Sequence, residues 1–230
     1  MALLALFALL IQTGVGWVVS LRLLRLAART RELPELALGS SVLLAIGLGY
    51  PLLVASAATA SAPLRFSGAL LVDVGFLLTA VFTWRVFRMG EPWAAAFVVG
   101  LAAAFLAQLA LTVTDERMAG LAQMHLAAAV YGWTAFEASL RGRMQQRRIA
   151  LGIGDAVVAN RLWLWTAMAG TSMFAALVNA VTIVDGIMPL EDPVVLVLTT
   201  SSGLVQATTL LLALAPPATY LGWLARKRSA

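Results

Sequence analysis

Apolar residues occur in seven long runs along the chain, and short polar segments separate them. Each run has about 20 residues, the length at which an α-helix crosses a hydrocarbon core of roughly 30 Å. No run shows the alternation of a strand, and backbone groups in lipid must bond within a helix or a closed barrel. The pattern predicts an all-α integral membrane protein with a single domain, residues 1–230, and seven transmembrane helices at residues 2–20, 36–58, 66–84, 93–113, 119–138, 162–184 and 194–215.

The composition favours lipid as the solvent, because 61% of the residues are hydrophobic and only 12% are charged. A soluble domain carries about a quarter charged residues. The chain has no cysteine and one histidine, His125, which excludes disulfides, cysteine-ligated metals and multi-histidine metal sites. Arginine outnumbers lysine 15 to 1, which indicates a GC-rich bacterial genome and hence the bacterial inner membrane.

The basic residues are distributed unevenly over the connecting segments. Fourteen of the 16 lie after the first, third and fifth helices or in the C-terminal tail, and the other two are Arg65 and Arg117. Positive residues stay in the cytoplasm, so the N-terminus is predicted outside and the C-terminus inside. The long loop from Arg141 to Arg161 is expected to contact anionic lipid headgroups rather than nucleic acid, and could also bind a cytoplasmic protein. Residues 218–228 place aromatic rings before a basic cluster, which is typical of an interfacial segment.

The string Gly152-Ile153-Gly154-Asp155 resembles the Gly-X-Gly-Asp motif of intramembrane aspartyl proteases. Such a protease needs a second aspartate at the same depth, because its two carboxylates share one proton. Asp73 lies far from this loop along the membrane normal, and the Tyr-Asp and Pro-Ala-Leu companions of that family are missing. The string therefore predicts a glycine turn followed by a helix cap at Asp155.

Polar residues within the apolar runs gather at one depth near the outer side. They are candidate ligand-binding residues: Asp73, Gln108, His125, Asn179, Thr199, Thr200 and Ser202. A carboxylate such as that of Asp73 is costly in lipid unless it is paired or protonated, and His125 is the expected partner of Asp73. The inner half looks barer, with Glu137 expected to pair with Arg141. Hydrogen bonding between helices is the alternative explanation of the whole layer.

The predicted topology resembles that of rhodopsins, G-protein-coupled receptors and seven-helix sugar transporters. The only lysine is Lys227 in the tail, so the last helix offers no amine for a retinal Schiff base, and no cofactor is expected. A receptor-like sensor with a small ligand in an outward-open polar pocket is the first hypothesis. A small-solute transporter, proton-coupled through Asp73 and His125, is the second. A non-catalytic assembly or scaffold protein is the third, and an enzyme ranks last because no catalytic motif is found.

Overall fold

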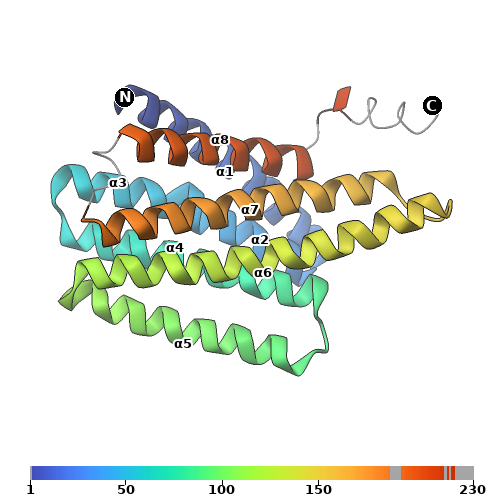
Figure 1. Ribbon diagram of the computed structural model, residues 1–230, viewed down its shortest axis with the longest axis horizontal. Coiled ribbons are helices and arrows are strands. Elements are labelled where there is room, and N and C mark those ends of the chain that lie inside the picture. The colour runs from blue at the N-terminus through green and yellow to red at the C-terminus, as the bar shows by residue number, and fades with distance from the viewer. Residues whose placement is uncertain (1, 187–192, 215–216, 218, 221–230) are drawn as a thin grey trace.

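The computed structural model describes every residue except 1, 187–192, 215–216, 218 and 221–230. The described chain folds into a bundle of helices without a strand (Figure 1). The helices are α1 (Ala2–Thr30), α2 (Leu33–Val42), the π-helix η1 (Leu43–Gly49), α3 (Tyr50–Thr59), α4 (Ala62–Phe87), α5 (Pro92–Thr114), α6 (Glu116–Ala150), α7 (Ala156–Val184) and α8 (Pro193–Leu214). Because α2, η1 and α3 follow one another without a break, the nine elements form seven rods, and the all-α prediction is confirmed.

Six of the seven rods are long and apolar enough to cross a membrane. The exception is α6, which carries Gln123 and His125 in its apolar part and a strongly basic C-terminal end. In the bundle α6 packs against α4, α5 and α7, so neighbouring helices rather than lipid cover much of it (Figure 1). The length and composition of these six rods indicate that the chain is a membrane protein.

The helix ends show why the sequence breaks where it does. Pro63 and Pro92 fall in the first turns of α4 and α5, where a missing N–H costs little. Asp155 caps α7, since its Oδ1 accepts a hydrogen bond from the N–H of Val157 at 2.8 Å. Gly152 supplies a positive φ of 76° just before it. The predicted turn and cap in the Gly-Ile-Gly-Asp string are thus confirmed.

The predicted long loop between Arg141 and Arg161 is wrong. Helix α6 continues to Ala150 and α7 begins at Ala156, so only five residues connect them. Arginine, glutamine and methionine are strong helix formers, and this stretch is rich in them. The basic residues therefore lie on two helical extensions instead of a loop. The predicted interfacial segment, residues 218–228, falls mostly outside the described residues.

The second rod is irregular at its centre, just before Pro51. Proline has no N–H, so the carbonyl of Gly47, four residues earlier, lacks its usual α-helical donor. The structure shows the π-helix η1 at this point, and the indole Nε1 of Trp17 on α1 donates to the Gly47 oxygen at 3.2 Å. The irregularity next to Pro51 is therefore a π-helical turn, and a side chain of α1 satisfies part of its backbone.

The second rod also lies unusually close to α4. A Cβ on Gly75 would lie 2.7 Å from the Cβ of Ala45 and 3.0 Å from the carbonyl oxygen of Ser41. A Cβ on Gly49 would lie 2.6 Å from Cγ2 of Val72. Small residues at such positions let membrane helices approach closely. This contact brings side chains of α2 within hydrogen-bonding distance of α4.

Candidate functional site: a buried polar column along α4

Four hydrogen-bonded side-chain pairs follow one another along α4. Three of them join α4 to α2 or α6, and the fourth joins Arg88, the residue after α4, to α6. We call them the polar column: Asp73–Gln123, Thr79–Ser41, Thr83–Thr134 and Arg88–Glu137. All members except Arg88 are buried. Asp73 and Arg88 are 15 residue steps apart along the chain, or about 22 Å at 1.5 Å per residue, which is most of a hydrocarbon core of about 30 Å.

The column member nearest the start of α4 is Asp73. It lies eleven residues into α4, about 16 Å from the start of the helix. Its Oδ1 accepts a hydrogen bond from Nε2 of Gln123 at 2.8 Å, while its buried Oδ2 has no hydrogen-bond partner among the described residues. The phenol of Tyr50 lies within electrostatic reach of this carboxyl group, and Tyr131 lies within reach of Tyr50. The site thus holds a half-satisfied carboxyl group with hydroxyl groups nearby.

The middle of the column consists of hydroxyl groups. Ser41 Oγ and Thr79 Oγ1 are 2.6 Å apart, and Thr83 Oγ1 and Thr134 Oγ1 are 2.8 Å apart. Thr83 also donates to the carbonyl of Thr79 at 3.0 Å, which links the two pairs through the backbone. A hydroxyl group can donate one hydrogen bond and accept others, so each of these groups can bond to two neighbours at once.

A small cavity lies beside the first hydroxyl pair, where α2, α4, α6, α7 and α8 meet. Its volume is about 30 Å³. Polar side chains contribute to its lining, namely Ser41, Thr79, Tyr131, Ser172 and Gln206. A cavity needs about 10–15 Å³ to hold a water and two to four polar partners to bind it. This one has room for a water or two but not for a metabolite.

The opposite end of the column, at the C-terminal end of α4, is an ion pair. Nε of Arg88, the residue that follows α4, lies 2.7 Å from Oε1 of Glu137 on α6. This hydrogen bond raises the pKa of the Arg88 guanidinium above its ordinary value. The predicted pairing of Glu137 with Arg141 is wrong, because Arg141 donates instead to the carbonyl of Phe87 at 3.0 Å. Arg141 therefore caps the end of α4, and Arg88 neutralises the carboxylate.

The predicted pairing of Asp73 with His125 is also wrong. Gln123 occupies that place, whereas His125 is exposed and its Nδ1 bonds to the carbonyl of Leu121 at 2.8 Å within its own helix. Two residues along an α-helix point about 200° apart. When Gln123 faces α4, His125 must face the outside of the bundle.

The other candidate residues of the outer layer mostly form local hydrogen bonds. Gln108 is buried, and its Nε2 reaches the carbonyl of Ala119 at 3.4 Å, which links α5 to α6. Asn179 and Thr199 donate to carbonyls one turn earlier in their own helices. Ser202 is buried, and the side chain of Thr200 lies outside the described set. Among the described side chains, Gln108, Asn179, Thr199 and Ser202 do not line the central cavity, so the outward-open pocket stays a prediction.

The half of the bundle toward the C-terminal end of α4 is more polar than the sequence suggested. Thr79, Thr83 and Thr134 are isolated in apolar runs, and an isolated threonine in a membrane helix usually bonds to its own backbone. The signal that was available is their spacing. Gly75, Thr79 and Thr83 follow one another at intervals of four residues and so lie close to one face of α4, whereas Asp73 lies about 120° from Thr79 around the helix.

No family model, curated protein or solved structure matches this chain. The function is therefore inferred from the geometry of the column alone.

Proposed function

We propose that the chain spans the membrane seven times, with its N-terminus outside, and transfers protons along the polar column. Six apolar rods support the membrane location, and α6 would be the seventh span. The turns that carry most arginines lie at one end of the bundle, and those next to Ser61 and Asp115 lie at the other (Figure 1). The positive-inside rule assigns the arginine-rich end to the cytoplasm.

The observation that carries this proposal is the position of Asp73. It is a buried carboxyl group with one oxygen free of hydrogen bonds among the described residues, and it lies at the outer end of a row of hydroxyl pairs. Intramembrane carboxyl groups are expensive and commonly mark proton or ion pathways. Here the carboxylate would take up a proton at Oδ2 and release it toward Tyr50 and the hydroxyl row.

The central cavity supports the same role. Proton transfer along hydroxyl groups requires short hydrogen-bonded steps. The column members on α4 lie about 6–9 Å apart along the helix axis, which is too far for a direct hydrogen bond. Waters in the cavity beside Thr79 and Tyr131 would shorten the step between Asp73 and Thr79. A proton-coupled solute transporter is the second candidate, since the column could couple proton movement to a solute that binds elsewhere. The receptor-like hypothesis has no observation of its own in this geometry.

Reconstituted vesicles test the proposal. Purified protein is placed in vesicles that contain a pH-sensitive dye, and a potassium diffusion potential drives protons inward, with and without pooled sugars and amino acids outside. We expect the wild type to acidify the lumen faster than Asp73→Asn in at least one arm. Asp155→Asn is the matched control, since it also removes one carboxylate but retains a helix cap. Equal rates for wild type and Asp73→Asn in both arms would show that the column only holds helices together.

A further inference from the structure

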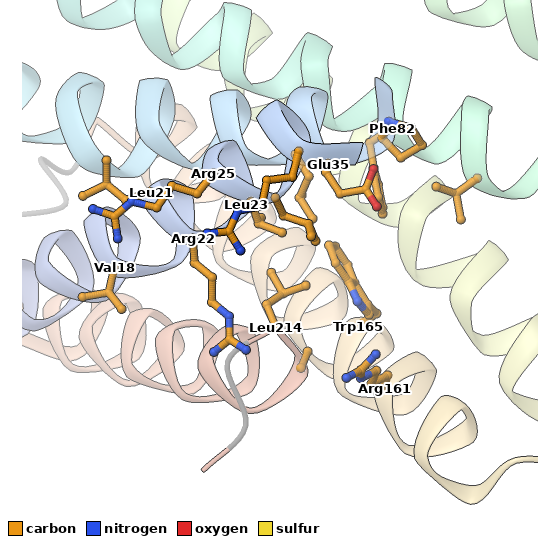
Figure 2. Close-up of a pocket in the computed structure, with 16 residues that line it drawn as sticks. Val18, Leu21, Arg22, Leu23, Arg25, Glu35, Phe82, Arg161, Trp165 and Leu214 are labelled. Atoms are coloured by element: carbon orange, nitrogen blue, oxygen red, sulfur yellow. The ribbon is translucent and has the colours of Figure 1, made fainter. Parts of the chain in front are cut away.

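A second and much larger pocket opens at the arginine-rich end of the bundle, away from the polar column. Its volume is about 910 Å³, and residues of α1, α2, α4, α7 and α8 line it (Figure 2). Sites for small molecules commonly measure about 300–1,000 Å³. The pocket is therefore large enough for an organic ligand, unlike the central cavity.

Four arginines give this pocket its charge. Arg22, Arg25 and Arg29 are spaced by three and four residues, so they share one face of α1, and Arg161 comes from α7. In Figure 2 the guanidinium groups of Arg22 and Arg161 extend toward the end of α8, where Leu214 lies. The ion pairs found among the described residues are Arg65–Glu116 and Arg88–Glu137, so none involves these four arginines.

The arginines at the opposite end of the bundle are used differently. Arg65 pairs with Glu116, and Arg117 donates to the carbonyls of Ile183 and Val184 at the end of α7, at 3.2 and 2.6 Å. The C-terminal residues beyond Pro217 carry no acidic side chain and add Arg226, Lys227 and Arg228. Among the described residues, no ion pair uses the four arginines of the pocket, so their charge is available to an anionic ligand.

The remaining walls of the pocket are apolar, with one exception. Leu21, Leu26, Phe82, Trp165 and Leu214 supply hydrocarbon surface beside the guanidinium groups. The exception is Glu35, whose Oε2 is buried and has no hydrogen-bond partner among the described residues. A ligand that fits must combine an anionic group, an apolar portion and a hydrogen-bond donor.

We propose that this pocket binds an anionic glycerophospholipid whose headgroup carries a hydroxyl group, as in phosphatidylglycerol. The phosphate would lie among Arg22, Arg25 and Arg161, because guanidinium groups bind phosphate oxygens in pairs. The headgroup hydroxyl would donate to Glu35, and the acyl chains would lie against Trp165 and Leu214. The pocket lies at the end of the bundle where headgroups are found, and arginine stems there extend toward the interface. The proposal does not depend on proton transfer.

Native mass spectrometry of the full chain in detergent tests this assignment. The probes are phosphatidylglycerol, phosphatidic acid and phosphatidylcholine with the same acyl chains, together with glycerol phosphate and inorganic phosphate as soluble anions. We expect phosphatidylglycerol to bind at least about tenfold more tightly than phosphatidylcholine, since each nearby arginine contributes about fivefold. Equal binding of the two lipids, or saturation of the site by the soluble anions, would overturn the proposal.

Variants of equal charge locate the site. The triple variant Arg22→Gln/Arg25→Gln/Arg29→Gln should weaken phosphatidylglycerol binding at least about tenfold. Its control, Arg143→Gln/Arg147→Gln/Arg148→Gln, removes the same charge from the exposed extension of α6 and should leave binding unchanged. Equal losses in both would show diffuse attraction to the basic end. If the triple variant does not fold, Arg161→Gln against Arg148→Gln makes the same comparison with single changes.

A variant of Glu35 tests the role of the headgroup hydroxyl in the same binding measurement. Glu35→Leu removes the acceptor and should weaken binding of phosphatidylglycerol relative to phosphatidic acid, which lacks the glycerol headgroup. An unchanged ratio between the two lipids would remove the hydroxyl from the proposal and contradict the assigned headgroup.

Discussion

Gln123 on α6 holds the buried carboxyl group of Asp73 on α4 through one hydrogen bond of 2.8 Å. Both side chains lie inside the bundle, and the amide is the only hydrogen-bond donor found for this carboxyl group among the described residues. The contact therefore fixes the rotation of α6 relative to α4 as well as the environment of the acid.

Gln123→Leu should lower the stability of the bundle by about 1–3 kcal/mol, because it leaves a buried carboxyl group without its donor. Thermal unfolding in a mild detergent measures the effect. His125→Leu, two residues away on the exposed face, should change stability by less than about 0.5 kcal/mol. A larger loss for His125→Leu than for Gln123→Leu would show that the histidine is the partner after all.

Arg88→Met should destabilise the protein by about 3 kcal/mol, since it leaves Glu137 buried and unpaired. Adding Glu137→Leu should recover most of that loss, because both charges are then gone. Arg141→Met is the control, and it should cost only about 1 kcal/mol through the lost bond to Phe87. A double variant as unstable as the first single variant would contradict a specific pair.

Trp17→Phe should cost about 1 kcal/mol, because it removes the donor to the Gly47 carbonyl. In a Pro51→Ala background the same change should cost less, since the new N–H at residue 51 can bond to that carbonyl. The unfolding of the two single variants and the double variant, measured together, gives the coupling. Additive losses would mean that Pro51 and Trp17 act independently.

Single cysteines at Ser61 and Thr114 should react with an impermeant thiol reagent applied from outside the cell. Cysteines at Thr30 and Gln145 should not, because they lie toward the arginine-rich end of the bundle. The native chain has no cysteine, so the background is clean. The reverse labelling pattern would contradict the proposed orientation, in which the N-terminus lies outside.

The positions of the helices follow from the sequence because long apolar runs have few alternatives in lipid. Their rotations do not follow in the same way. In α6 the residues around Gln123 and His125 are apolar on every side, so no polar face indicates which of the two points inward. The choice depends on the neighbouring helices α4, α5 and α7, against which α6 packs. For this reason the helix that carries Asp73 could be predicted, whereas the hydrogen-bond partner of Asp73 could not.

The π-helical segment η1 has a consequence for register. Each residue of an α-helix turns the chain by about 100°, whereas a π-helix spreads its turn over more residues. The seven residues Leu43–Gly49 therefore offset the faces of α2 and α3 relative to an unbroken α-helix. Ser41 lies before this offset and meets Thr79, and Tyr50 lies after it and comes within reach of Asp73. One irregular turn thus sets the phase between two halves of a rod, and it determines which groups of the second rod face the acid.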